Sequence, residues 1–164
     1  MSAKIYNVLF VCMGNSARSI LAEALLNEAG RGRFQAFSAG SHPIGLVNPR
    51  ALMTLNEMGV PTGKARSKNW SELVRSDAPE MDFVITVCDS AAGEVCPIYP
   101  GQPVTAHWGM PDPAAVRGSE DEKRVAFRDA AVNLKRRIDL MLTLPLSSLD
   151  SVATKRELRD IGER

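Results

Sequence analysis

The chain has 164 residues, close to the usual size of one domain, and its 45% hydrophobic and 24% charged residues are near globular averages. This composition disfavours a disordered chain, a collagen-like chain and a coiled coil. The 20 Lys and Arg residues nearly balance the 19 Asp and Glu residues, so the net charge of +1 gives no reason to expect nucleic acid or an anionic membrane as a partner. An anion site in this chain must therefore be local.

The sequence contains no apolar run near the roughly 20 residues that a membrane helix needs, and its first residues do not read as a secretory signal. These features predict a cytoplasmic protein. In a reducing compartment the three cysteines, Cys12, Cys88 and Cys96, are not expected to form a permanent disulfide. These cysteines are either inert thiols of the core or reactive thiols that take part in function.

The first half of the chain alternates predicted strands and helices. Residues 5–11 form a short apolar run rich in β-formers, which is typical of a strand buried on both faces of a parallel sheet. Residues 15–29 have helical spacing, and Gly30 stands where a helix ends. A second strand is expected over 34–38 and a second helix over 49–58.

The second half continues this alternation. Its predicted elements are a short helix near 70–74, a strand over 82–88, a loop over 89–102, a strand over 104–108, a helix over 119–142 and an amphipathic segment over 149–161. Alternating strands and helices indicate an open parallel α/β sheet, in which the ligand binds at the carboxyl ends of the strands.

A cysteine followed six positions later by an arginine stands where the first predicted strand ends. Five residues wrapped at a helix N-terminus turn their backbone N–H groups inward and form a cup for a tetrahedral oxyanion. Arg18 can bind two oxygens of that anion through its planar guanidinium, and Gly14 permits a tight turn. A helix N-terminus lowers the pKa of a cysteine from about 8.5 to between roughly 3.5 and 7.5, so we expect Cys12 to be a thiolate nucleophile.

The same pattern has a simpler interpretation, in which Cys12 is a buried strand-end thiol and Arg18 a surface residue, because this spacing also arises by chance. Its position between a strand and a helix, and the glycine and asparagine within it, favour the cup. Ser19 either donates its hydroxyl to the thiolate or is an ordinary residue of the first helical turn. The expected oxyanion-binding residues are Met13, Gly14, Asn15, Ser16, Ala17, Arg18 and Ser19.

The chain resembles the superfamily of low-molecular-weight tyrosine phosphatases and the arsenate reductases that share their fold. The resemblance rests on residues 8–12 with the cup, and on Ala22-Glu23-Ala24, Ser38-Ala39-Gly40, His107-Trp108-Gly109 and Asp112-Pro113-Ala114. It implies a flavodoxin-like α/β fold, with an open sheet of four parallel strands and helices on both faces. We expect one domain over 1–164, with a C-terminal helical extension over about 146–164.

Asp112 is the expected general acid. When a thiolate attacks phosphorus or arsenic, the departing oxygen leaves more easily if a carboxylic acid protonates it. In the superfamily an Asp-Pro pair on a distant loop does this, and Asp112-Pro113 matches that pair. Without the cup, the simpler interpretation of Asp112-Pro113 would be a turn.

Cys88 and Cys96 separate the two activities that the resemblance implies. Phosphoryl transfer needs one thiolate and a water, whereas reduction of arsenate to arsenite needs two electrons, which a thiol pair supplies when it becomes a disulfide. The alternative is that Cys88 and Cys96 are two buried apolar thiols. The segment that contains them looks like the relay segment of thioredoxin-coupled arsenate reductases, and Ala114 stands where the tyrosine phosphatases usually carry an aromatic residue.

We therefore predict an arsenate reductase in which Cys12, Arg18, Asp112, Cys88 and Cys96 are catalytic. A tyrosine or small-molecule phosphatase is the alternative enzyme, and an oxyanion or redox sensor is the non-enzymatic alternative. The expected partners are arsenate or a phosphate-like oxyanion, and thioredoxin, glutaredoxin or a low-molecular-weight thiol as the reductant. No nucleic acid or membrane partner is expected.

No cofactor or metal is expected, although some members of the superfamily bind a potassium ion beneath the cup. By match, Asn15, Glu23 and Ser38 would be its candidate ligands. Asn69 stands near the position where the family pattern has an acidic ligand, which argues against a potassium site.

Overall fold

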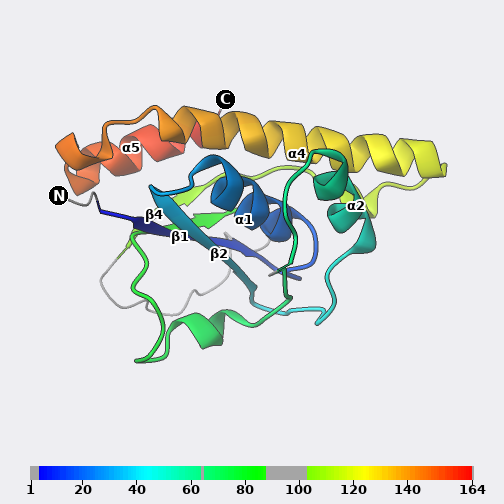
Figure 1. The fold of residues 1–164 in the computed structure, drawn as a ribbon, viewed down its shortest axis with the longest axis horizontal. Coiled ribbons are helices and arrows are strands. Elements are labelled where there is room, and N and C mark those ends of the chain that lie inside the picture. Colours follow the sequence, from blue (N-terminus) through cyan, green and yellow to red (C-terminus); the bar gives the residue numbers. More distant parts are fainter. Residues whose placement is uncertain (1–3, 64, 88–102, 164) are drawn as a thin grey trace.

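Four parallel strands form one open sheet in the computed structural model, which describes residues 4–63, 65–87 and 103–163 (Figure 1). The strands are β1 (Tyr6–Cys12), β2 (Phe34–Gly40), β3 (Phe83–Thr86) and β4 (Val104–His107). Their spatial order, β2-β1-β3-β4, is the flavodoxin-like order, so the predicted α/β fold class is confirmed. In such a sheet the ligand site lies at the carboxyl ends of β1 and β3, where the strand order reverses.

Strand β1 is the centre of the sheet. It pairs with β2 on one side and with β3 on the other. Because both of its edges and both of its faces are covered, the side chains of residues 8–11 are fully buried, as the continuous apolar run predicts. Strand β1 ends at Cys12, and its neighbour β2 ends at Gly40 in register with it.

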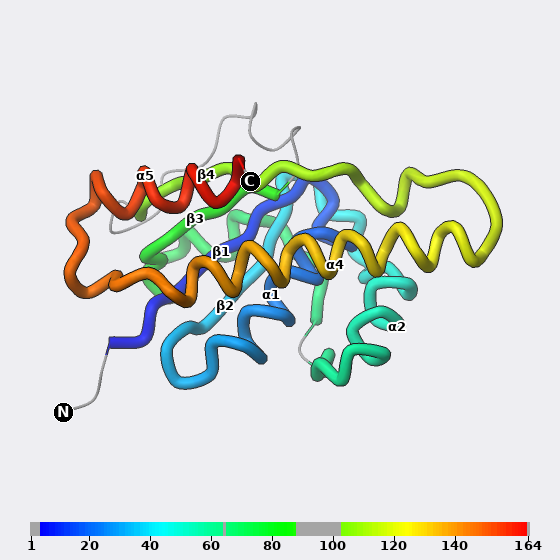
Figure 2. Tube along the Cα trace, turned by 90° about the horizontal axis from the view of Figure 1, so that it is seen from above, coloured from blue at the N-terminus to red at the C-terminus, as the bar shows by residue number. Residues whose placement is uncertain are grey.

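The described helices are mostly on one side of the sheet. The α-helices are α1 (Arg18–Ala29), α2 (Pro49–Glu57), α4 (Glu120–Leu142) and α5 (Ser151–Gly162), and the short 3-10 helices are η1 (Trp70–Leu73), η2 (Pro113–Ala115) and η3 (Leu146–Ser148). Figures 1 and 2 show α1, α4 and α5 along one side, with the segment that carries η1 on the other. No helix in the described ranges is long and apolar enough to cross a membrane.

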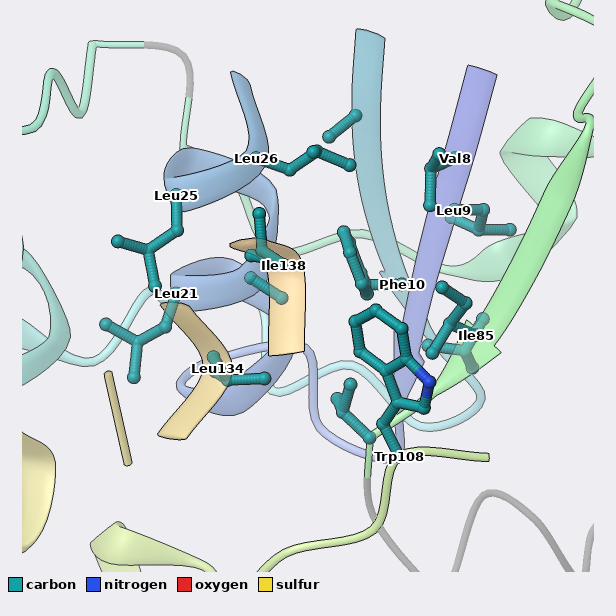
Figure 3. Close-up of a cluster of buried hydrophobic side chains, with 14 of the residues drawn as sticks. Val8, Leu9, Phe10, Leu21, Leu25, Leu26, Ile85, Trp108, Leu134 and Ile138 are labelled. Carbon is teal, nitrogen blue, oxygen red and sulfur yellow. The ribbon is translucent and has the colours of Figure 1, made fainter. Parts of the chain in front are cut away.

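The main core lies between the sheet and helices α1 and α4 (Figure 3). Phe10 of β1 packs against Trp108, with ring centroids 6.1 Å apart and planes inclined at 49°. Leu25 of α1 and Ile138 of α4 are at most 1% exposed in the same cluster. This packing fixes β1 and α1 relative to each other, and therefore fixes the loop that joins them.

Helix α1 begins at Arg18, so the prediction of a helix from Asn15 is wrong. Asn15 has a φ of 44°, in the left-handed region, and a right-handed helix cannot pass through that conformation. Asparagine tolerates the left-handed region better than most residues, because its short side chain forms local hydrogen bonds. The residues between Cys12 and Arg18 therefore form a loop, and the positive φ expected at Gly14 occurs at Asn15 instead.

Helices α4 and α5 are capped by the residues that precede them. Ser119 accepts a hydrogen bond from the N–H of Glu122, whose carboxylate accepts one from the N–H of Ser119, which completes a capping box. Asp150 caps α5 by accepting from the N–H of Ala153. Helix α5, the predicted C-terminal extension, packs against β4 (Figure 2).

Candidate active site

Backbone carbonyl groups of the loop between β1 and α1 accept hydrogen bonds from residues 42–44. Met13 O accepts a hydrogen bond from His42 N at 2.9 Å, and Gly14 O accepts one from Ile44 N at 3.0 Å. Because the C=O and N–H of a trans peptide unit point in opposite directions, the N–H groups of the following residues face the inner side of the loop. This is the arrangement of an anion-binding cup, and the buried Cys12 lies at its start.

Gly40 is the residue of β2 that comes closest to this loop. A Cβ atom at Gly40 would lie 2.4 Å from Met13 O and 2.7 Å from Cys12 O, both of them backbone atoms. The loop can approach β2 this closely only because residue 40 has no side chain.

We expect Gly40→Ala to displace the loop and to destabilise the fold by about 2 kcal/mol, as overpacking against backbone typically does. Urea unfolding measures the stability, and calorimetric titration with inorganic phosphate measures the cup. Gly63→Ala is the matched control, because a Cβ there would have nothing within 4 Å. Equal stability and equal phosphate affinity in the two variants would contradict this account.

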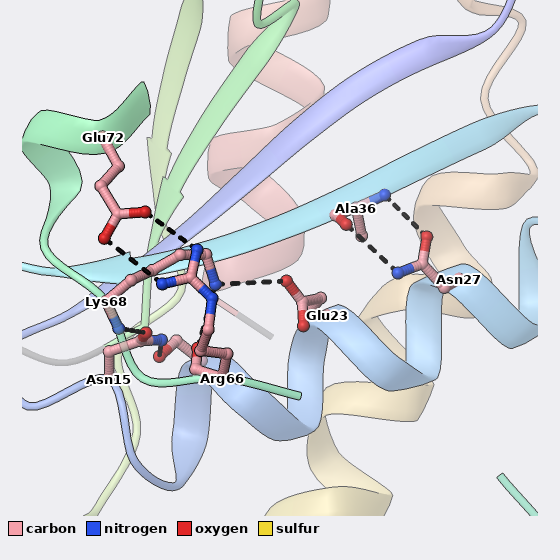
Figure 4. Close-up of polar contacts among 8 residues, drawn as sticks. Asn15, Glu23, Asn27, Ala36, Arg66, Lys68 and Glu72 are labelled. Carbon is pink, nitrogen blue, oxygen red and sulfur yellow. Dashed lines mark hydrogen bonds and ion pairs between the residues drawn. The ribbon is translucent and has the colours of Figure 1, made fainter. Parts of the chain in front are cut away.

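The segment 67–69 holds the other side of the loop. Ser67 Oγ donates to Gly14 O at 3.3 Å, and the backbone N–H of Lys68 donates to Asn15 Oδ1 at 2.8 Å (Figure 4). Asn15 Nδ2 in turn donates to Ser19 Oγ at 2.8 Å, which leaves the Ser19 hydroxyl hydrogen available as a donor. The contacts of Ser67 and Lys68 with the loop were not predictable from the sequence, because the segment is polar and has no periodicity.

Arg18 joins the cup to the loop that carries Asp112. Its Nη1 donates to Met110 O at 2.9 Å, and its Nη2 lies 3.6 Å from Asp112 Oδ2. Asp112 also caps η2 by accepting from the N–H of Ala114 at 2.9 Å. The structure thus brings Arg18 and Asp112 together, and it places Cys12 at the carboxyl end of β1, six residues before Arg18.

A second arginine supports the Asp112 loop from behind. Arg137 of α4 is 5% exposed, and its Nη1 donates to Gly109 O at 3.2 Å. Burial lowers the pKa of Arg137, and the neighbouring Arg136 acts in the same direction. Two consecutive carbonyl groups of the loop, at Gly109 and Met110, are therefore each held by a guanidinium. Nothing in the local sequence predicts this contact of Arg137, which lies within an amphipathic helix.

Other predicted residues are placed away from the chemistry or outside the described ranges. His107 Nδ1 lies 2.6 Å from Thr86 Oγ1, and Trp108, the next residue of the family motif, is fully buried. Cys88, Cys96 and the predicted loop over 89–102 lie outside the described residues.

The residues that the superfamily pattern offers for a potassium ion are Asn15, Glu23 and Ser38, and a cation of the chain lies beside one of them. Lys68 Nζ lies 4.0 Å from the Glu23 carboxylate, so a chain cation already faces this candidate ligand (Figure 4). Asn69 Oδ1 accepts from Ser71 N at 2.8 Å as the cap of η1. Across the ranges that the structure describes, no group of three or more His, Cys, Asp and Glu side chains is placed to hold a metal ion either.

We expect Arg18→Lys to lower the kcat/KM of the oxyanion reaction roughly 100-fold, although the charge is kept, because a lysine cannot form the two parallel hydrogen bonds of a guanidinium. Arg31→Lys is the matched control, since Arg31 forms an exposed ion pair with Glu28. Steady-state kinetics with arsenate and with an aryl phosphate measure the effect. Near-wild-type turnover in Arg18→Lys would rule out the two-oxygen contact.

Residues 7–155 match the sequence profile of the family described as low molecular weight phosphotyrosine protein phosphatase. The chain belongs to this family. A curated family member, the arsenate reductase of Shouchella clausii (strain KSM-K16), is 36% identical over 129 residues, which cover 78% of this chain and 87% of that protein.

Solved structures of the family share the fold of this chain. A structure described as an arsenate reductase in the phosphate binding state is 25% identical, with a TM-score of 0.62, and the match covers 82% of this chain and 94% of that one. The thioredoxin-dependent arsenate reductase of Corynebacterium glutamicum is 28% identical, with a TM-score of 0.56, and the match covers 85% of this chain and 65% of that one.

Proposed function

We propose that this family member is an arsenate reductase that uses Cys12 as the nucleophile and a thiol relay through Cys88 and Cys96. The contact between Arg18, which ends the Cys12 loop, and Asp112 supports this proposal most strongly, since Arg18 Nη2 and Asp112 Oδ2 lie 3.6 Å apart. The identity of 36% to a curated arsenate reductase favours arsenate over other oxyanions.

In the first step the Cys12 thiolate attacks the arsenic atom of arsenate. The N–H groups of the loop and the Arg18 guanidinium hold the arsenate oxygens, so the charge that develops on them is stabilised. Asp112 gives its proton to the departing oxygen, which leaves as water once protonated. The product is a covalent Cys12–arsenic(V) intermediate.

In the second step the Cys88 thiolate attacks the sulfur of Cys12. An S–S bond forms between Cys12 and Cys88, the S–As bond breaks, and its electron pair stays on arsenic, which leaves as arsenite. Cys96 then attacks the sulfur of Cys88, releases the Cys12 thiolate and forms a Cys88–Cys96 disulfide. This disulfide stores the oxidising equivalents of one turnover.

Thioredoxin is the proposed reductant of that disulfide. The thioredoxin-dependent relative from Corynebacterium glutamicum supports this choice over glutaredoxin or a low-molecular-weight thiol. A reducing cytoplasm, the compartment expected from the sequence, would supply it.

Phosphatase activity is a side reaction that the same cup would allow. The first step with a phosphate ester needs only Cys12, Arg18 and Asp112, and a water completes the reaction. Ala114 and Ala115 follow Asp112-Pro113 in the short helix η2, so this segment offers no aromatic side chain to flank a tyrosine ring.

Arsenate-dependent oxidation of NADPH tests the proposal, with the thioredoxin and glutaredoxin systems supplied separately. We expect sustained oxidation with the thioredoxin system. Oxidation with glutaredoxin alone would replace the proposed reductant. Binding of arsenate without turnover in either system would instead favour a sensor, and hydrolysis of aryl phosphates alone would favour a phosphatase.

A further inference from the structure

A carboxylate of α1 is buried beside the loop that forms the cup. The Glu23 side chain is 12% exposed. Burial raises the pKa of Glu23 above its ordinary value, while the Lys68 ammonium and the neighbouring Ser38 act in the opposite direction. The buried Ser38 hydroxyl has no hydrogen bond of ordinary geometry among the described residues, yet it lies close enough to Glu23 to favour the ionised form. A carboxylate in such a place needs a cation nearby.

Lys68 supplies that cation from within the chain. Its Nζ lies 4.0 Å from Glu23 Oε1 and donates to Arg66 O at 3.0 Å, and the Lys68 side chain is 9% exposed. Burial lowers the pKa of Lys68, and the charge of Glu23 opposes that shift. The pair therefore joins the segment 67–69 to α1, and both side chains are mostly covered by the protein (Figure 4).

The backbone of Lys68 connects the same residue to the cup. Its N–H donates to Asn15 Oδ1 at 2.8 Å, and its carbonyl accepts from Gly40 N at 2.9 Å. Asn15 is the residue of the loop with a positive φ, so its side-chain contacts support a left-handed backbone conformation in the cup. A shift of Lys68 would be transmitted to Asn15 directly.

We infer that Lys68 is a positioning residue, whose ammonium serves as an internal counter-ion for Glu23 and holds the oxyanion loop in its anion-binding conformation without an exchangeable alkali-metal ion. This inference rests on the proposed oxyanion site, although it does not depend on the identity of the oxyanion. It assigns Lys68 no contact with substrate.

The first test compares cations on the wild-type protein. The affinity for inorganic phosphate is measured by calorimetry in KCl, NaCl and tetramethylammonium chloride at equal ionic strength. We expect equal affinities, because the cation position is filled by Lys68. A phosphate affinity that rises specifically with potassium would overturn the inference, and this measurement needs no variant.

The second test removes the ammonium. We expect Lys68→Met to weaken phosphate binding about tenfold, because the Glu23 carboxylate would lose its cation. The loss of free energy when a buried charge is left without its partner is typically as large as that change in affinity, or larger. The KM for arsenate should rise more than kcat falls, and KCl, but not tetramethylammonium chloride, should restore part of the affinity. Lys135→Met is the matched control, because Lys135 pairs with Asp139 on the solvent-exposed side of α4 and should tolerate the same change.

A double variant separates a counter-ion from a mere packing contact. Glu23→Gln combined with Lys68→Met removes both charges, and we expect it to bind phosphate more tightly than Lys68→Met alone. The inference fails if Lys68→Met binds phosphate like wild type, or if neither potassium nor Glu23→Gln improves the single variant. If wild type binds phosphate in the expected pattern but does not reduce arsenate, the proposed function fails and this inference stands.

Discussion

Cys12→Ser is expected to abolish both arsenate reduction and hydrolysis of aryl phosphates, with a loss of about 10,000-fold or more in kcat. Both reactions begin with attack by the same sulfur, and a serine hydroxyl is not ionised near neutral pH. Arsenite release and aryl phosphate hydrolysis are measured on the same preparation. Retention of either activity at a substantial level would show that the nucleophile is another residue.

A binding measurement shows whether a loss of activity in Cys12→Ser is caused by unfolding of the variant. The amide groups of the loop and Arg18 are unchanged in Cys12→Ser, so inorganic phosphate should still raise the midpoint of thermal unfolding. A variant that is inactive and also fails to respond to phosphate would be uninformative about the nucleophile, and Cys12→Ala would then be compared in its place.

Cys88→Ser and Cys96→Ser are each expected to stop multiple-turnover reduction of arsenate with thioredoxin. Hydrolysis of an aryl phosphate should change by less than about twofold, because that reaction uses no second thiol. The two variants should differ in a single turnover: Cys96→Ser can still form the Cys12–Cys88 disulfide and release one arsenite per protein, whereas Cys88→Ser releases none.

Steady reduction of arsenate by both variants with thioredoxin would rule out the relay. An external low-molecular-weight thiol would then take the second step, and the rate should rise with the concentration of that thiol. The two wild-type activities are the internal control, since a folding defect lowers both together while a relay defect lowers only one.

Most helices and strands could be predicted from local sequence patterns. The apolar run that predicts the first strand is fully buried over residues 8–11, because that strand is central. The second helix was expected from residue 49, and Asn48 caps α2 there by accepting a hydrogen bond from Arg50 N at 2.9 Å. The start of α1 was misplaced, because helical spacing continues into the cup and only the positive φ of Asn15 reveals the loop.

The site was only partly predictable, because its supports come from distant parts of the chain. Cys12 and Arg18 share one local pattern, which made them visible. Lys68 and Arg137 act through a buried charge and a backbone carbonyl, and nothing in their local sequence distinguishes them from ordinary surface cations. Such residues emerge only when the fold brings their partners next to them.

The packing of α5 on β4 connects this helix to the active-site loop. Trp108 Nε1 donates to Leu158 O at 2.8 Å, and a Cβ at Gly162 would lie 2.3 Å from His107 O. Gly109 and Met110 follow Trp108, and their carbonyl groups accept hydrogen bonds from Arg137 and Arg18. A displacement of α5 would therefore shift the strand that leads to Asp112, so this last helix helps to hold the active-site loop in place although it lies outside the cup.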